Sequence, residues 1–167
     1  MRLIIDQQPA ANDSWNYLAS ENGVTPDFSA LSEDSDLLVD WCCWQQCRDQ
    51  LLSRSGRIGV KINGAVEVQA LASDLDKLAL IAVDFPSFAD GRGFSQARLL
   101  KDSYGFSGEL RAVGDVTWDR LRFMHRCGFN AYEIADERYS EKMLAAFDEI
   151  TVRLQGSSDD SRPIYRQ

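Results

Sequence analysis

The short run Asp90-Gly91-Arg92-Gly93 holds the residue types in this sequence that are best suited to binding an anion. Its two glycines permit positive φ angles and a close approach of the backbone to a ligand. A helix is expected just after it, and the free N–H groups at a helix start attract anions. The Arg92 guanidinium can hold a phosphate, sulfate or carboxylate with two hydrogen bonds. The run therefore predicts an anion-binding loop, unless Asp90 and Arg92 pair with each other and only order the turn.

Further polar residues are expected around the same rim and complete a candidate ligand-binding set. Carboxylates at Asp84, Asp90 and Asp115 could serve acid–base chemistry or hold a divalent cation. Asp84 could instead orient a turn, and Asp115 fits the N-cap of a helix. Arg111 alternates with apolar residues in an expected strand, so we expect it to pair with a carboxylate, which more often organises a fold than performs catalysis. The candidate set is Asp84, Asp90, Gly91, Arg92, Gly93, Ser95, Arg98, Arg111 and Asp115; the catalytic residues stay unknown.

The sequence shows no pattern for a known cofactor, so the cofactor stays unknown. It holds neither a G-x-x-x-x-G-K-S/T phosphate loop nor a G-x-G-x-x-G dinucleotide turn. Its four cysteines form no Cys-x-x-Cys pair and are accompanied by a single histidine, so no metal site is predicted. We expect Cys42, Cys43, Cys47 and Cys127 to be buried thiols, the alternatives being a redox role or an iron–sulfur contact. His125 lacks a visible catalytic partner and is expected to be structural or to lie at the surface.

Apolar runs and segments of helical period alternate along the chain, which predicts an α/β fold with repeated βα units. The continuous run Leu78–Val83 is typical of a strand covered on both faces. The alternation implies a mainly parallel sheet, either open or forming an incomplete TIM-like barrel. The turns after residues 83, 113 and 134 would then meet at one rim, where such folds bind ligands. The expected strands are 3–5, 37–39, 57–62, 78–83, 109–113 and 129–134, the expected helices are 41–53, 95–104, 116–127 and 140–154, and 65–77 fits either.

The composition indicates one globular domain, with 167 residues, a formal net charge of −8 and 44% hydrophobic residues. We expect a single α/β domain over 1–155, with an irregular lead-in over 7–36, followed by a mobile polar tail over 156–167. No long apolar run or signal peptide is apparent, which predicts a cytoplasmic protein without a membrane partner. The acidity argues against nucleic acid as a partner. Much of the negative charge lies in residues 1–55, where it either serves solubility or forms a docking face for a basic partner.

The run from Ile81 to Arg98, IAVDFPSFADGRGFSQAR, resembles the signature of a bacterial family of unknown function, DUF934. The resemblance continues through residues 108–115 and 126–129, and covers roughly residues 36–150. Arg120 stands where the family pattern leads us to expect Gln after Asp119. Members of this family are typically encoded beside assimilatory sulfite reductase and the reductase for activated sulfate, and some are labelled oxidoreductases without an established reaction. The resemblance thus implies a role in sulfur assimilation that leads to cysteine biosynthesis.

Three functions are compatible with these observations. The first is an accessory protein of assimilatory sulfite reduction that acts by contact with the reductase, since no complete catalytic constellation is visible. The alternative is an enzyme or binding protein that takes an oxyanion or a phosphorylated small molecule at the carboxyl ends of the parallel strands. A third is a structural subunit that forms a homodimer by completing a partial barrel or extending a sheet.

Overall fold

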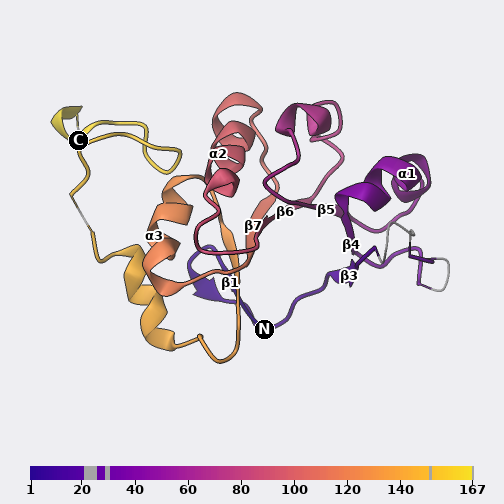
Figure 1. Cartoon of the computed structure of the whole chain (residues 1–167), viewed down its shortest axis with the longest axis horizontal. Coiled ribbons are helices and arrows are strands. Elements are labelled where there is room, and N and C mark those ends of the chain that lie inside the picture. Colours follow the sequence, from indigo (N-terminus) through magenta and orange to yellow (C-terminus); the bar gives the residue numbers. More distant parts are fainter. Residues whose placement is uncertain (21–25, 29–30, 151, 167) are drawn as a thin grey trace.

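The frame of the protein is an eight-stranded, mostly parallel sheet that curls into a half-barrel, seen in a computed structural model that describes residues 1–20, 26–28, 31–150 and 152–166 (Figure 1). The strand order is β2-β1-β8-β7-β6-β5-β4-β3. Strands β3 to β8 pair in parallel, whereas β1 is antiparallel to both β8 and β2. The strands are β1 (Arg2–Ile5), β2 (Gln8–Pro9), β3 (Asn16–Leu18), β4 (Leu37–Asp40), β5 (Ile58–Ile62), β6 (Leu80–Phe85), β7 (Glu109–Gly114) and β8 (Ala131–Ile134).

The helices that connect these strands lie on the convex side of the sheet (Figure 1). The α-helices are α1 (Trp41–Leu52), α2 (Arg92–Arg98) and α3 (Trp118–Arg126). The 3-10 segments are η1 (Val68–Leu71), η3 (Glu141–Phe147) and η4 (Ile164–Arg166), and a π-helical turn, η2 (Leu99–Ser103), continues α2. The mixed α/β architecture with a mainly parallel sheet agrees with the sequence pattern. Among the described residues, no helix has the length and apolarity needed to cross a lipid bilayer.

Strand β6 is covered on both faces, as its unbroken apolar run predicts. Ile81, Val83 and Phe85 belong to the large core beneath the helices. Leu80 and Ala82, which point the other way, pack with a smaller cluster on the concave face that includes Trp15. Because successive side chains of a strand alternate between faces, cover on both faces requires apolar residues at consecutive positions, as in residues 80–83 of β6.

Residues 10–15, called the strap below, cross the concave face of the sheet from β2 at one edge to β3 at the other. Seven strand spacings of a flat sheet would measure about 34 Å. The chain from Pro9 to Asn16 reaches at most about 25 Å. The strap can therefore join the two edges only because the sheet is curled. The short strands β2 and β3 also lie within 7–36, which the sequence analysis describes as irregular.

The strap is held by Arg111, whose side chain is only 1% exposed at the middle of the concave face. Its guanidinium donates to Asp13 from Nη1 at 2.6 Å and from Nη2 at 3.2 Å. Nε donates to Glu109 at 2.7 Å, and Glu133 lies 4.0 Å from Nη1. The expected pairing of Arg111 with a carboxylate is thus confirmed. A guanidinium this deeply buried requires such partners, because an unpaired charge in the interior is strongly unfavourable.

Two helices differ from their expected bounds by three residues or more at one end or both. Helix α2 begins at Arg92 rather than at Ser95, and Gly93 permits its close approach to β6, since a Cβ there would lie 2.7 Å from the Phe85 ring. The helix expected over 140–154 is the shorter 3-10 segment η3. The apolar spacing places Ile150 and Leu154 on a buried face, but both are exposed. Without a packing surface for these side chains, little stabilises a longer helix.

Replacing Arg111 with Ala should lower the free energy of unfolding by about 3–5 kcal/mol, because two carboxylates lose their buried partner. Urea denaturation followed by circular dichroism measures this loss. The matched control is Arg98→Ala, which breaks the exposed Arg98–Asp102 pair and should cost less than about 1 kcal/mol. Equal losses in the two variants would contradict the role assigned to Arg111.

Candidate functional site

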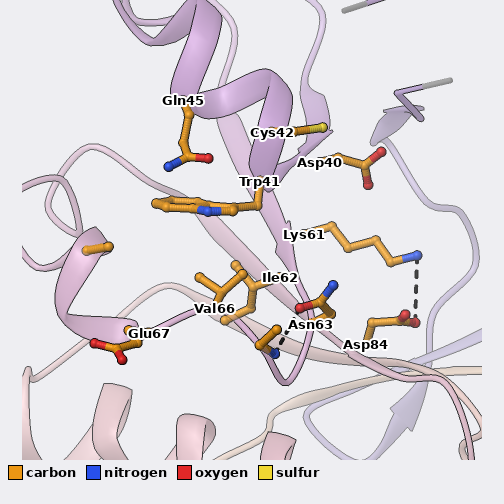
Figure 2. Close-up of a pocket in the computed structure, with 12 residues that line it drawn as sticks. Asp40, Trp41, Cys42, Gln45, Lys61, Ile62, Asn63, Val66, Glu67 and Asp84 are labelled. Carbon is orange, nitrogen blue, oxygen red and sulfur yellow. Dashed lines mark hydrogen bonds and ion pairs between the residues drawn. The ribbon is translucent and has the colours of Figure 1, made fainter. Parts of the chain in front are cut away.

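A cleft of about 600 Å³ opens at the carboxyl ends of β4, β5 and β6 (Figure 2). Asp40 is the last residue of β4, Ile62 the last of β5, and Asp84 the last but one of β6. In parallel α/β sheets this edge is the usual place for a ligand, because the connecting turns leave it open. We refer to this hollow as the carboxyl-end cleft.

Strand register brings three charged side chains together on one side of the cleft. Asp40 lies opposite Lys61 on the neighbouring strand, and Lys61 lies opposite Ala82, two residues before Asp84. Residues at these positions share a face of the sheet. The Lys61 Nζ is 3.7 Å from Asp84 Oδ1, and Figure 2 shows the two side chains reaching toward each other beside Asp40.

Hydrogen bonds from β3, the strand that follows the strap, and from the residues just after it orient the Asp40 side chain. The Tyr17 hydroxyl of β3 donates to Asp40 Oδ1 at 2.8 Å, and the backbone N–H of Ser20 donates to Oδ2 at 2.7 Å. Burial and the hydrogen bond to this carboxylate raise the pKa of Tyr17 well above its ordinary value, so the hydroxyl stays protonated. Asp40 occupies the N-cap position of α1, but its side chain makes no capping bond to the helix.

The remaining wall of the cleft combines an aromatic plane with amide and carboxylate groups. Trp41 and Gln45 come from α1, and Asn63 and Glu67 come from the turn between β5 and η1. Figure 2 shows the Trp41 indole spread across the cleft, with Lys61 on one side of it and Glu67 on the other. The charged lining residues are Asp40, Glu67 and Asp84 against Lys61, a formal charge of −2.

In the loop of residues 90–93, the charges of Asp90 and Arg92 neutralise each other. The Arg92 guanidinium donates to both carboxylate oxygens of Asp90, at 3.0 and 2.8 Å, and the Arg92 backbone N–H donates to the same side chain at 3.1 Å. Hydrogen bonding from Arg92 lowers the pKa of Asp90 to about 2. The structure thus shows the pairing that the sequence analysis gives as the alternative to an anion-binding loop.

The predicted site residues do not converge on one pocket. The turns after β6, β7 and β8 do meet there, because the Asp115 N–H donates to the Phe85 carbonyl at 2.7 Å and the Asp115 carboxylate pairs with Arg138. Thr117, not Asp115, occupies the N-cap of α3. Of the predicted set, Asp84 lines the carboxyl-end cleft, whereas Arg92 and Ser95 line a separate hollow of about 410 Å³. Gly91 is the N-cap of α2, and Gly93 packs on Phe85. Arg98 pairs with Asp102, and Arg111 is buried.

The cysteines offer little reactivity in this arrangement. All four are free thiols, and Cys43 and Cys127 are buried. Burial raises the pKa of Cys43 to about 11 and also raises that of Cys127, which disfavours the reactive thiolate. Burial lowers the pKa of His125 and favours its neutral form. Within the described ranges, no three His, Cys, Asp or Glu side chains form a group suited to a metal ion.

The predicted set contains one residue that lines the cleft, Asp84. It contains neither the lining residues Asp40, Trp41, Lys61 and Glu67 nor Tyr17, which holds Asp40. The available signal was a charge at the end of an otherwise apolar strand, as Lys61 stands in Ile58–Ile62 and Asp40 in Leu37–Asp40. Such a charge at the carboxyl end of a parallel strand points to the rim, as the charge of Asp84 does in β6.

Comparison with known proteins identifies one family. A model of a family described as a bacterial protein of unknown function, DUF934, matches residues 59–165, which is more than half of the chain. A search of curated proteins finds no match.

Replacing Arg92 with Ala should raise the pKa of Asp90 from about 2 toward its ordinary 3.8, because the carboxylate loses its main hydrogen-bond donor. Carbon-13 NMR of the side-chain carboxyl groups during an acid titration measures this pKa. Arg138→Ala serves as the control, since it should raise the pKa of Asp115 and leave that of Asp90 unchanged. An unchanged Asp90 in Arg92→Ala would show that Arg92 is free to bind another anion.

Proposed function

Because the chain belongs to DUF934, a bacterial family of unknown function, we propose its function from its geometry: the carboxyl-end cleft binds a small organic ligand that carries a positive charge. The observation that carries this proposal is the Trp41 ring set among three carboxylates. The proposal keeps the location expected from the sequence, the carboxyl ends of the parallel strands, and changes the charge of the ligand.

The charge of the lining favours a cation. Lys61 already forms an ion pair with Asp84. The other two carboxylates of the lining, those of Asp40 and Glu67, lie on the two sides of the Trp41 indole. These carboxylates would repel an oxyanion such as sulfite or phosphate, whereas they would attract an ammonium group. A cleft lined by one sign of charge also raises the local concentration of the opposite ion.

The aromatic plane favours a ligand with an apolar or cationic group that stacks. Trp is the best side chain for cation–π contact, which contributes about 0.5–1 kcal/mol at exposed sites and more where water is excluded. Gln45 and Asn63 supply amide groups at the margins of the same cleft. A few polar groups around an apolar surface are typical of small-molecule sites.

Phenethylamine should bind at least about tenfold more tightly than 3-phenylpropionate, because the two probes share a ring and differ in the sign of their charge. Isothermal titration calorimetry gives both dissociation constants. Trp41→Leu and Glu67→Gln should each weaken amine binding, whereas Trp118→Leu removes an exposed indole outside the cleft and should change nothing. Equal binding of the two probes, or no effect of Trp41→Leu, would refute the proposal.

A second candidate function is favoured by an exposed aromatic patch. Phe88 is 61% exposed and Phe123 is 53% exposed. They are linked through Phe94, whose ring centroid is 4.8 Å from that of Phe123, and through Arg120, whose guanidinium carbon lies 5.0 Å from the Phe94 ring and 5.2 Å from the Phe88 ring. Exposed aromatic groups of this kind often mark protein interfaces. We define this patch as Phe88, Phe94, Arg120 and Phe123.

This patch supports the proposal that the protein is a cytoplasmic accessory protein of sulfite reduction, and so of sulfur assimilation and cysteine biosynthesis. In this proposal the patch contacts sulfite reductase, and the acidic charge of residues 1–55 steers the encounter. The support comes from the family resemblance together with the exposure of Phe88 and Phe123.

The tagged protein should retain sulfite reductase from a cell extract at low salt, and the double variant Phe88→Ser/Phe123→Ser should lose most of it, because the patch loses its apolar contacts. Quantitative immunoblotting measures the retained enzyme. Tyr165→Ser, which alters an exposed aromatic residue outside the patch, is the control. Failure of the wild type to retain the reductase, with unchanged reductase activity in a deletion strain, would exclude this function.

A further inference from the structure

Three arginines meet a single carboxylate beside α3, on a part of the fold that does not line the carboxyl-end cleft. Arg122 and Arg126 lie four residues apart on α3 and so share one face of that helix. Arg153 follows η3, and its Nη1 donates to Asp159 Oδ2 at 2.8 Å. Arg122 Nη2 is 3.6 Å from the same oxygen, and Arg126 Nε is 3.9 Å from Oδ1. We call Arg122, Arg126 and Arg153 the arginine cluster.

The arginine cluster holds more positive charge than its close partners neutralise. Across the described residues, Asp159 is the only carboxylate within 4 Å of the three guanidinium groups. Asp148 attracts Arg122 only from farther away. Burial, followed by repulsion from Arg153, lowers the pKa of Arg122. The side chains of Arg122, Arg126 and Arg153 are 13%, 25% and 24% exposed, so most of their N–H groups need acceptors within the protein, and one carboxylate offers few.

Particular buried N–H groups of the arginine cluster lack a hydrogen-bond acceptor. The Nε atoms of Arg122, Arg126 and Arg153 are buried and have no hydrogen-bond acceptor in the described part of the chain. The C-terminal end of α3 interacts favourably with Arg126, but it supplies no acceptor for these buried N–H groups. Each of the three arginines that approach the Asp159 carboxylate therefore keeps one buried N–H group without an acceptor.

The chain itself covers this position. Ser157 Oγ and the Ser158 backbone N–H both donate to the Arg126 carbonyl, and Arg126 Nη2 donates to the Gln155 carbonyl at 2.8 Å. These contacts seat residues 155–159, the tail segment, on the last turn of α3 and leave the Asp159 side chain 8% exposed. The mobility expected for residues 156–167 stays a prediction.

We propose that the arginine cluster is a binding site for a tetrahedral oxyanion, either free or as the monoester of a small molecule, and that Asp159 occupies this site in the ligand-free protein. A tetrahedral oxyanion presents at least three terminal oxygens where a carboxylate presents two, so it can accept the Nε–H bonds that Asp159 leaves unmet. The ligand enters as Asp159 leaves and the tail segment lifts from α3. Because Asp159 competes for the site, the apparent affinity for the oxyanion is the intrinsic affinity multiplied by the fraction of molecules whose site is free.

Two variants of equal charge test the competition. Asp159→Asn removes the internal anion, whereas Asp160→Asn removes the next carboxylate, which pairs with Arg162. Isothermal titration calorimetry with sodium sulfate, sodium phosphate and adenosine monophosphate, at ionic strength held constant with chloride, should show at least about tenfold tighter binding to Asp159→Asn than to Asp160→Asn. Adding Arg126→Gln to Asp159→Asn should abolish the binding. Tighter binding of adenosine monophosphate than of phosphate would identify a monoester as the ligand, and the reverse would identify the free ion.

Equal affinities of Asp159→Asn and Asp160→Asn, or binding that survives Arg126→Gln, would overturn the proposal. Circular dichroism checks that both variants fold. The wild type provides an independent measurement that needs no substitution: sulfate, compared with chloride of the same ionic strength, should accelerate backbone hydrogen exchange in residues 155–159 as the tail segment is displaced. Unchanged exchange there at saturating sulfate would overturn the proposal even if Asp159→Asn does not fold.

Discussion

The neutralisation of one buried guanidinium is the constraint on which the arrangement of this protein depends. Arg111 sits at the centre of the concave face, and Asp13 reaches it from the strap. That contact places Trp15 on the inner apolar cluster and leads the chain into β3. Tyr17 of β3 then holds Asp40 at the edge of the cleft. A single charge in the sheet thus determines where the lead-in runs and how one wall of the candidate site is oriented.

Local patterns in the sequence predicted the features that depend on local physics. The apolar run of β6 indicated a strand covered on both faces, and the charge of Arg111 between apolar neighbours indicated a paired guanidinium. The same patterns could not show which carboxylate would reach Arg111, because Asp13 lies 98 positions away in the chain. The cleft was missed for a similar reason: Asp40 and Lys61 come together only through strand register. Arg92, in contrast, was paired by a residue two positions away, an outcome that its sequence left open.

The excess negative and the excess positive charge gather at different places in this fold. The carboxyl-end cleft collects carboxylates around an indole, whereas α3 and the tail segment collect guanidinium groups around one aspartate. Arg120 belongs to neither group: it is buried against the rings of Phe85, Phe88 and Phe94 and donates to the Asp115 carbonyl at 3.0 Å. An arginine at this position therefore supports aromatic packing at the edge of the sheet.

The pairing of the first strand with the last has a consequence for how the chain folds during its synthesis on the ribosome. Besides the short strand β2, β1 pairs with β8, which ends at Ile134, and the strap is anchored on Arg111 of β7. At translation rates of about 5–20 residues per second, the amino-terminal segment waits on the order of ten seconds for these partners to emerge. During that interval Leu38 and Leu80 have no cover from Trp15. The nascent protein therefore passes through a stage with an uncovered apolar surface, the kind of surface that chaperones bind.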